Sequence, residues 1–240
     1  FGPLFWPEVK LKVVEALKVK NQGPSLRFPF GTDQLGRDMM VRMMAAGKVS
    51  LAVGFVAMII AIFVGTGIGI LAGYFKRLDG PLMRMTDLFL SLPLIPLLLV
   101  LVMLFRDTIA SVLGPELGAF LLIVFAIGIT SWMQAARIVR GEVLALKERE
   151  YVLAAKSIGV PARRVILRHI LPNILGPIIV YTTLTIPAVM LLEAFLSFLG
   201  LGVQPPMSSW GVLIKDGAEK MEEFAWLLVF PAALFSLTLF

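Results

Sequence analysis

The sequence predicts an all-α membrane protein, built as a bundle of spanning helices. Of its 240 residues, 58% are hydrophobic and 16% are charged, and the mean hydropathy is +0.90. A soluble domain carries about 25% charged residues, and one of this length has no room to bury so much apolar surface. The charges are also segregated, because long stretches contain no Asp, Glu, Lys, Arg or His, and five of them are free of clustered turn-forming residues. These observations exclude a soluble enzyme, a disordered chain and a disulfide-linked scaffold.

The five uncharged stretches are predicted to be five spanning helices. Each is 17 to 27 residues long, and about 20 apolar residues cross the hydrocarbon core of a bilayer. Residues 51–240 therefore form the predicted transmembrane domain. Its spans cover about residues 51–75, 88–105, 117–136, 173–195 and 224–240.

Residues 1–50 form a separate segment that mixes charged and apolar positions. Val9–Lys20 is predicted to be a short amphipathic helix. Apolar residues between Leu35 and Met44 are predicted to lie along the membrane interface, with Arg37 and Arg42 facing the lipid headgroups.

The first predicted span carries a series of small residues on one helix face, at Gly65, Gly69 and Gly73. Small residues spaced by four allow two helix backbones to approach closely in lipid. We therefore predict that this face packs against another helix.

The basic residues indicate the orientation of the chain in the membrane. Residues 76–87 and 137–169 hold 11 Lys and Arg over 45 positions, whereas the loops on the other side hold 11 over 86. The denser side is predicted to be cytoplasmic. The net charge of +6 is explained by this topology and by lipid headgroups, so no nucleic-acid partner is predicted.

Two residues of the fourth span are candidates for the translocation path or its gate. Pro187 frees a backbone carbonyl and permits a kink, which is either static or a moving hinge. Glu193 follows an uncharged run, and a charge near membrane depth usually faces protein or water. It is either a contact on the path or an interface residue with local partners.

The long loop on the basic side, 137–172, is predicted to carry the function. In its first helix Val152, Ala155 and Ile158 share one face, and Gly159 ends the helix. This amphipathic pattern differs from that of a linker.

A second short helix is predicted to begin at Pro161, which suits the first position of a helix, and to end before Pro172. It carries Arg163 and Arg164. Two short helices at right angles would make residues 150–168 a rigid projection that a partner can grip.

This loop resembles the cytoplasmic signature of ABC importer permeases. Where the broad family pattern has Glu directly before two alanines, this chain has Leu153, with Glu150 three residues upstream. Its Tyr-Val-x-Ala-Ala form is similar to the peptide-transporter branch. In that family the loop docks into a cleft of the ATP-hydrolysing subunit. The resemblance implies coupling residues at Glu150, Ala154, Ala155, Gly159, Arg163, Arg164, His169, Leu171 and Pro172.

Three further segments resemble the same branch, namely residues 30–38, residues 72–75 with Asp79, and residues 193–211. With the loop, they cover most of the chain. The chain is therefore identified as similar to the C-type permease subunit of dipeptide, oligopeptide and nickel importers.

The resemblance implies a type I permease of six spans with its N-terminus inside. The first span of the full protein is then expected before residue 1, and residues 1–50 become an extracytoplasmic segment. The expected location is a bacterial-type inner membrane, with lipid around the bundle. The implied partners are a second permease subunit, two ATP-binding subunits and an extracytoplasmic solute-binding protein.

The chain itself is not expected to be an enzyme. His169 is its single histidine, it has no cysteine, and it has no phosphate-binding loop of the Gly-x-x-x-x-Gly-Lys-Ser/Thr type. No catalytic residue, metal site or cofactor is predicted, and ATP and Mg are expected on the partner subunits. Peptides are the leading solute, and nickel or another small solute is the alternative. The rival class is a channel or secondary carrier, which usually shows ionisable relays within its spans.

Overall fold

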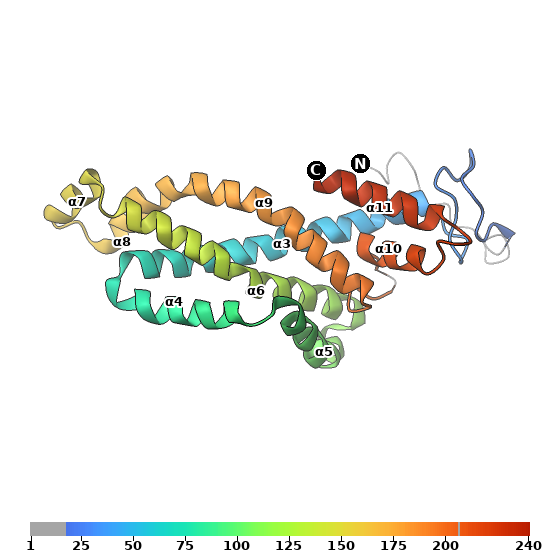
Figure 1. Ribbon diagram of the computed structural model, residues 1–240, viewed down its shortest axis with the longest axis horizontal. Coiled ribbons are helices and arrows are strands. Elements are labelled where there is room, and N and C mark those ends of the chain that lie inside the picture. Colours follow the sequence, from blue (N-terminus) through green and yellow to red (C-terminus); the bar gives the residue numbers. More distant parts are fainter. Residues whose placement is uncertain (1–17, 206) are drawn as a thin grey trace. The chain divides into compact units, whose positions relative to one another are not determined.

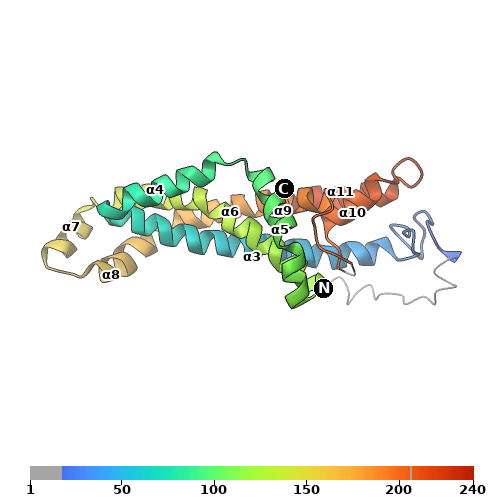
Figure 2. The same cartoon turned by 90° about the horizontal axis from the view of Figure 1, so that it is seen from below.

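The computed structural model describes residues 18–205 and 207–240, and this part of the chain is helical. Its β pairing is a single isolated bridge between Thr32 and Asp38. The all-α prediction is confirmed. The helices, shown in Figures 1 and 2, are α3 (Met39–Tyr74), α4 (Lys76–Ser91), α5 (Leu94–Leu113), α6 (Pro115–Leu146), α7 (Glu150–Ser157), α8 (Ala162–Val165), the π-helical turn η1 (Ile166–Ile170), α9 (Leu171–Phe198), α10 (Trp210–Ala218) and α11 (Trp226–Leu239).

Four helices of the described residues are long and apolar enough to cross a membrane. They are α3, α5, α6 and the continuous helix Ala162–Phe198, which joins α8, η1 and α9. Helix α11 is apolar but shorter, at 14 residues. The membrane bundle predicted from the uncharged stretches is thus present, with four long helices and a shorter fifth one.

The second predicted span, 88–105, is broken instead of continuous. Helix α4 ends at Ser91 and α5 begins at Leu94. Of the two residues between them, Leu92 is extended, with φ −78° and ψ 135°. Pro93 is the cause, because a proline ring disfavours the helical conformation of the residue before it and supplies no N–H.

The contacts divide the chain into two compact units. The first unit comprises residues 18–54, 102–123 and 190–240 of the described chain, and the second comprises residues 55–101 and 124–189. Helices α3, α5, α6 and α9 each contribute a segment to both units.

In the first unit, the start of α3 differs from the interfacial helix predicted for this region. Met39 and Met43 are each 2% exposed, so they are core residues of this unit. The guanidinium of Arg42 lies 2.9 Å from a carboxylate oxygen of Asp33 and therefore has a protein partner. The other predicted helix, Val9–Lys20, lies almost wholly outside the described residues.

In the second unit, α3 packs closely on α6 through the glycine face. A Cβ atom added to Gly65 would lie 2.5 Å from the Cβ of Ala135. One added to Gly69 or Gly73 would lie 2.7 Å from the Cβ of Val139 or Val143. Real Cβ atoms do not approach this closely, so these three positions require glycine for the two helices to meet as they do.

Candidate functional site

Helix α7 is the first part of the candidate site, the element spanning residues 150–170. Glu150 lies in its first turn, where a negative charge interacts favourably with the helix dipole. Gly159 follows the helix with φ +81°. The N–H of Val160 donates to the carbonyl of Ala155 at 3.0 Å, and that of Gly159 donates to Lys156 at 3.0 Å. This is the Schellman arrangement, and Gly159 ends α7 as the sequence predicted.

The second helix of the element does not end where it was predicted to end. It begins after the extended residue Pro161, but it continues through η1 into α9 beyond Pro172. In the π-helical turn the N–H of Leu171 donates to the carbonyl of Ile166, five residues back. The wider turn accommodates the chain at Pro172, which has no N–H of its own to donate. The element is therefore continuous with a spanning helix.

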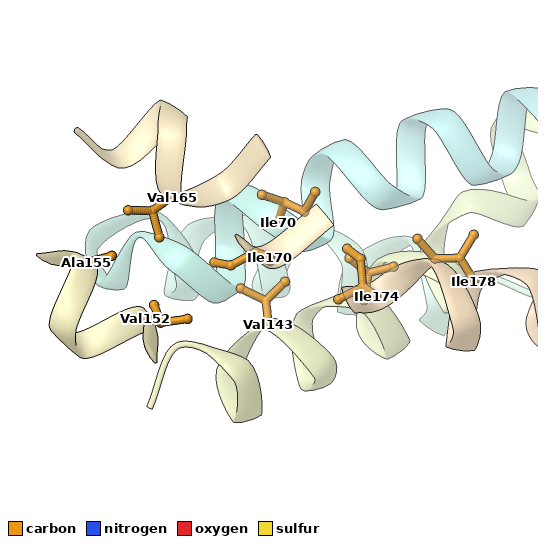
Figure 3. Packing of buried hydrophobic residues seen from close by; sticks show 9 residues of the cluster. Ile70, Val143, Val152, Ala155, Val165, Ile170, Ile174 and Ile178 are labelled. Carbon is orange, nitrogen blue, oxygen red and sulfur yellow. The ribbon is translucent and has the colours of Figure 1, made fainter. Parts of the chain in front are cut away.

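A buried apolar cluster holds the 150–170 element to the helices of the second unit, of which it is part. Val152 and Val165 are fully buried, and Ile170 lies with them (Figure 3). Burying one such side chain stabilises a fold by about 1.5–3 kcal/mol. The element is thus a rigid part of the unit. The cluster consists of Ile70 of α3, Val139 and Val143 of α6, Val152 and Ala155 of α7, Val165 of α8, Ile170 of η1, and Ile174 and Ile178 of α9.

Ile158 does not share the buried face on which the sequence placed it. It is 82% exposed, whereas Val152 and Ala155 are buried. The reason is that α7 ends at Ser157, so the helical spacing no longer applies one residue later. An isoleucine side chain therefore stands exposed at the turn between the two helices.

The other residues predicted for coupling are divided between the surface and the core of this element. Glu150, Ala154 and Gly159 are exposed, and so are Arg163, Arg164 and Pro172. Ala155 belongs to the core, and Leu171 packs partly buried against it. His169 is half-buried, with its ring centroid 6.2 Å from that of Tyr151. A hollow of about 610 Å³ beside α7 is lined by Leu146, Glu148, Arg149, Glu150, Tyr151 and Asn173.

Two lysines connect this region to the corner between α3 and α4. The ammonium of Lys147 donates to the carbonyl of Gly73 at 3.0 Å. The ammonium of Lys156, on α7, lies 5.2 Å from the ring centroid of Tyr74, within range of a cation–π interaction. Sequence reasoning missed both contacts, because their partners lie more than 70 residues away along the chain.

An ion pair between α4 and α6 was also missed. Arg140 reaches both carboxylate oxygens of Asp79, with its Nη2 donating to Oδ2 at 2.7 Å. The hydrogen bonds from Arg140 hold the pKa of Asp79 below its usual range. The sequence marked Asp79 as part of a family-like segment, but nothing in the sequence identified its partner.

Glu193, a candidate for the translocation path, is fully buried in the first unit. Its carboxylate accepts hydrogen bonds from Ser197 at 2.6 Å and from Ser50 at 3.3 Å. Ser197 lies 3.1 Å from Ser209, which in turn caps α10 by accepting from the N–H of Val212. Glu193 thus has partners within the protein, and its place on the translocation path stays a prediction.

The first unit also contains a charged hollow of about 290 Å³. Arg42 lies within it between Asp33, at 2.9 Å, and Asp216, at 3.6 Å. Burial raises the pKa of Asp216 above its ordinary value, and the charge of Arg42 opposes that shift. The charges that line the hollow thus largely neutralise one another.

The chain matches a family model over residues 65–240, described as the binding-protein-dependent transport system inner membrane component. It is 46% identical over 212 residues to the oligopeptide transport system permease protein of Haemophilus influenzae, covering 88% of this chain and 65% of the relative. It is 41% identical over 241 residues to the dipeptide transport system permease protein of Bacillus subtilis, covering 100% of this chain and 71% of the relative. The chain thus spans about two thirds of the length of these relatives.

A solved structure supports the fold at low sequence identity. The fold is similar to that of an inward-facing methionine ABC transporter, with a TM-score of 0.64 at 15% identity, over 84% of this chain and 91% of that one. The extent of the family match and the identity to the permeases settle the relationship. The chain belongs to the binding-protein-dependent transport system inner membrane components, the ABC importer permeases.

Proposed function

We propose that the chain is the transmembrane subunit of an ATP-driven importer of peptides. The observation that carries this proposal is the rigid, exposed element 150–170, held by its own buried cluster at the end of the second unit. The named relatives are permeases of oligopeptide and dipeptide systems, which favours peptides over nickel or another small solute. We therefore propose an importer and not the channel or secondary carrier that was the alternative from the sequence.

ATP binding and hydrolysis, with Mg, are assigned to two partner subunits, and this chain is given no nucleotide site or cofactor of its own. A second permease subunit and an extracytoplasmic solute-binding protein complete the proposed assembly. Helices α5 and α9 carry exposed apolar residues over much of their length, which lipid or the second permease subunit would cover.

The 150–170 element is the proposed point at which the ATP-binding subunits act. Its surface combines the exposed Ile158, the small residues Ala154 and Gly159, and the guanidinium groups of Arg163 and Arg164. Small residues let a partner approach the backbone, and an exposed apolar side chain gains free energy when the partner covers it. Closure of the two ATP-binding subunits would displace this rigid surface and, with it, the helices in its cluster.

Pro187 is the proposed hinge of the translocation path. It lies inside α9 and has no N–H to donate to the carbonyl of Thr183, one helical turn back. The helix therefore lacks one backbone hydrogen bond at this point, which lowers the resistance to bending.

A matched pair of substitutions tests the coupling proposal. Ala154→Arg adds a large side chain to the exposed surface of α7, and Ala145→Arg adds the same side chain to an exposed position of α6. In the full complex reconstituted in liposomes with its binding protein, Ala154→Arg is expected to abolish ATP-dependent uptake of a labelled dipeptide and to weaken retention of the ATP-binding subunits. Ala145→Arg should leave both intact. Wild-type-like uptake by the Ala154→Arg complex would refute the coupling role, and uptake of nickel in place of the dipeptide would refute the proposed solute.

A further inference from the structure

Three side-chain contacts meet at the corner between α3 and α4, all within the second unit. Lys156 of α7 lies over the ring of Tyr74, and Lys147 donates to the carbonyl of Gly73. Asp79, in the first turn of α4, receives two hydrogen bonds from Arg140 of α6. The last residues of α3 and the first turn of α4 are thus attached to α6 and α7 together.

The Asp79–Arg140 pair is the strongest of these contacts. Both oxygens of the carboxylate are engaged, which is the bidentate geometry that makes arginine–carboxylate pairs strong and specific in direction. The side chains are 32% and 26% exposed, for Arg140 and Asp79 respectively. The close approach of α3 and α6 at Gly73 brings the corner within reach of this pair.

A second ion pair between α4 and α6 offers a natural comparison. Arg137 of α6 contacts Asp87 of α4 through one nitrogen, and their side chains are 52% and 58% exposed. Exposed ion pairs of this kind contribute little to stability, because water and salt screen them. Only the Asp79–Arg140 pair lies next to the contacts made by Lys147 and Lys156.

We propose that Asp79 and Arg140 are positioning residues for transport: they fix the α3–α4 corner to the 150–170 element, so that the corner and the element move as one rigid body. This proposal rests on the proposed function, in which partner subunits displace the element. The buried cluster already joins α7 to α3, α6 and α9, but α4 has no residue in that cluster. The first turn of α4 is therefore joined to α7 through the α3–α4 corner, and the pair holds this corner to α6.

Charge reversal and charge exchange test the pair in the assembled transporter. The variants are Asp79→Arg, Arg140→Asp and the double exchange, measured for ATP hydrolysis and dipeptide uptake in the same proteoliposomes. The single variants are expected to keep ATP hydrolysis but to transport about tenfold less dipeptide per ATP, the scale of a coupling free energy between sites. The double exchange should restore most of the wild-type ratio of dipeptide transported to ATP hydrolysed. Asp87→Arg and Arg137→Asp, at the comparison pair, should leave it unchanged.

The proposal is overturned if the single variants keep the wild-type ratio, or if the exchange fails to restore it. The experiments that test this proposal differ from those that test the proposed function. Loss of ATP-dependent uptake by Ala154→Arg together with normal ratios in the Asp79 and Arg140 variants would retain the coupling element and remove only the positioning role.

A distance measurement tests rigidity without disturbing the pair. The chain has no cysteine, so spin labels can be placed on Ser157→Cys of α7 and Arg77→Cys of α4, both exposed positions. In the complex with otherwise native sequence, the distance between the labels is expected to be the same with and without ATP. In the Asp79→Arg background it is expected to change when ATP is added. A change with ATP in the native background would contradict the rigid-body proposal, whether or not any charge variant assembles.

Discussion

The hydroxyl of Ser197 donates to the carboxylate of Glu193 at 2.6 Å, and both residues are fully enclosed by the first unit. They lie one helical turn apart on α9. Ser50 of α3 donates to the other carboxylate oxygen, at 3.3 Å, and also accepts from the N–H of Trp210. One acidic side chain thus organises hydrogen bonds from α3, α9 and the start of α10.

Replacing Glu193 tests this network. Glu193→Ala would remove the acceptor for two buried hydroxyls and leave a cavity, and an unsatisfied buried polar group costs about 1–3 kcal/mol. We expect a lower melting temperature for the purified transporter. Glu193→Gln keeps the shape of the side chain and one acceptor oxygen, so its melting temperature should fall less. Equal melting temperatures for the Ala and Gln variants would contradict the hydrogen-bonding role.

Alanine substitutions at two nearby glycines of α3 are predicted to have opposite effects on stability. A Cβ at Gly69 would lie 2.7 Å from the carbonyl oxygen of Ala136, whereas one at Gly67 would meet nothing within 4 Å. Gly69→Ala should therefore destabilise the protein by about 1–3 kcal/mol, the usual cost of overpacking. Gly67→Ala should be neutral or stabilising. Thermal unfolding of both variants in detergent measures this, and similar losses in the two would show that α3 does not approach α6 so closely.

The turn after α7 predicts a cost for a side chain at Gly159. Its φ of +81° lies in the left-handed region, where an alanine costs about 1–2 kcal/mol. Gly141 lies inside α6 with open space around it, so Gly141→Ala should gain about 0.5–1 kcal/mol of helix propensity. Comparing the unfolding free energies of the two alanine variants tests the turn. A stabilising Gly159→Ala would be incompatible with it.

The Asp79–Arg140 pair predicts a dependence of stability on pH. Arg140 lowers the pKa of Asp79 in the folded protein below that of an unfolded Asp, which is about 4. The pair's contribution to the free energy of unfolding is therefore full above that value and is lost as the pH falls through the lowered folded value. Asp79→Asn lacks this contribution. Its melting temperature should lie below that of the native sequence at neutral pH, and the gap should close in acid. A gap that stays constant with pH would exclude the ionised pair as its source.

The sequence predicted the parts of this molecule that depend on local patterning. Uncharged runs located the apolar helices, and Gly159 located the end of α7, because both signals come from residues adjacent in the chain. The spacing of Gly65 and Gly69 marked a helix face, although the partner helix was not known from the sequence.

The sequence was less informative where tertiary contacts or neighbouring helices decide the outcome. Pro172 reads as a helix end, but a π-helical turn carries the chain through it. Met39 and Arg42 suit a membrane interface, yet one is buried and the other pairs with Asp33. The link between Asp79 and Arg140 depends on how α4 folds back along α6, and single-residue patterns do not encode that distance of 61 positions.

The most direct test of the central claim is a crosslink from the exposed turn of the 150–170 element. Ile158→Cys and, as a control, Leu26→Cys in the segment predicted to be extracytoplasmic each place one cysteine at a highly exposed position of a chain that has none. In membranes that contain the complete transporter, a short thiol-to-amine crosslinker should join Ile158→Cys to an ATP-binding subunit and should not join Leu26→Cys to it. Absence of the Ile158→Cys adduct, or an equal adduct from Leu26→Cys, would contradict the account.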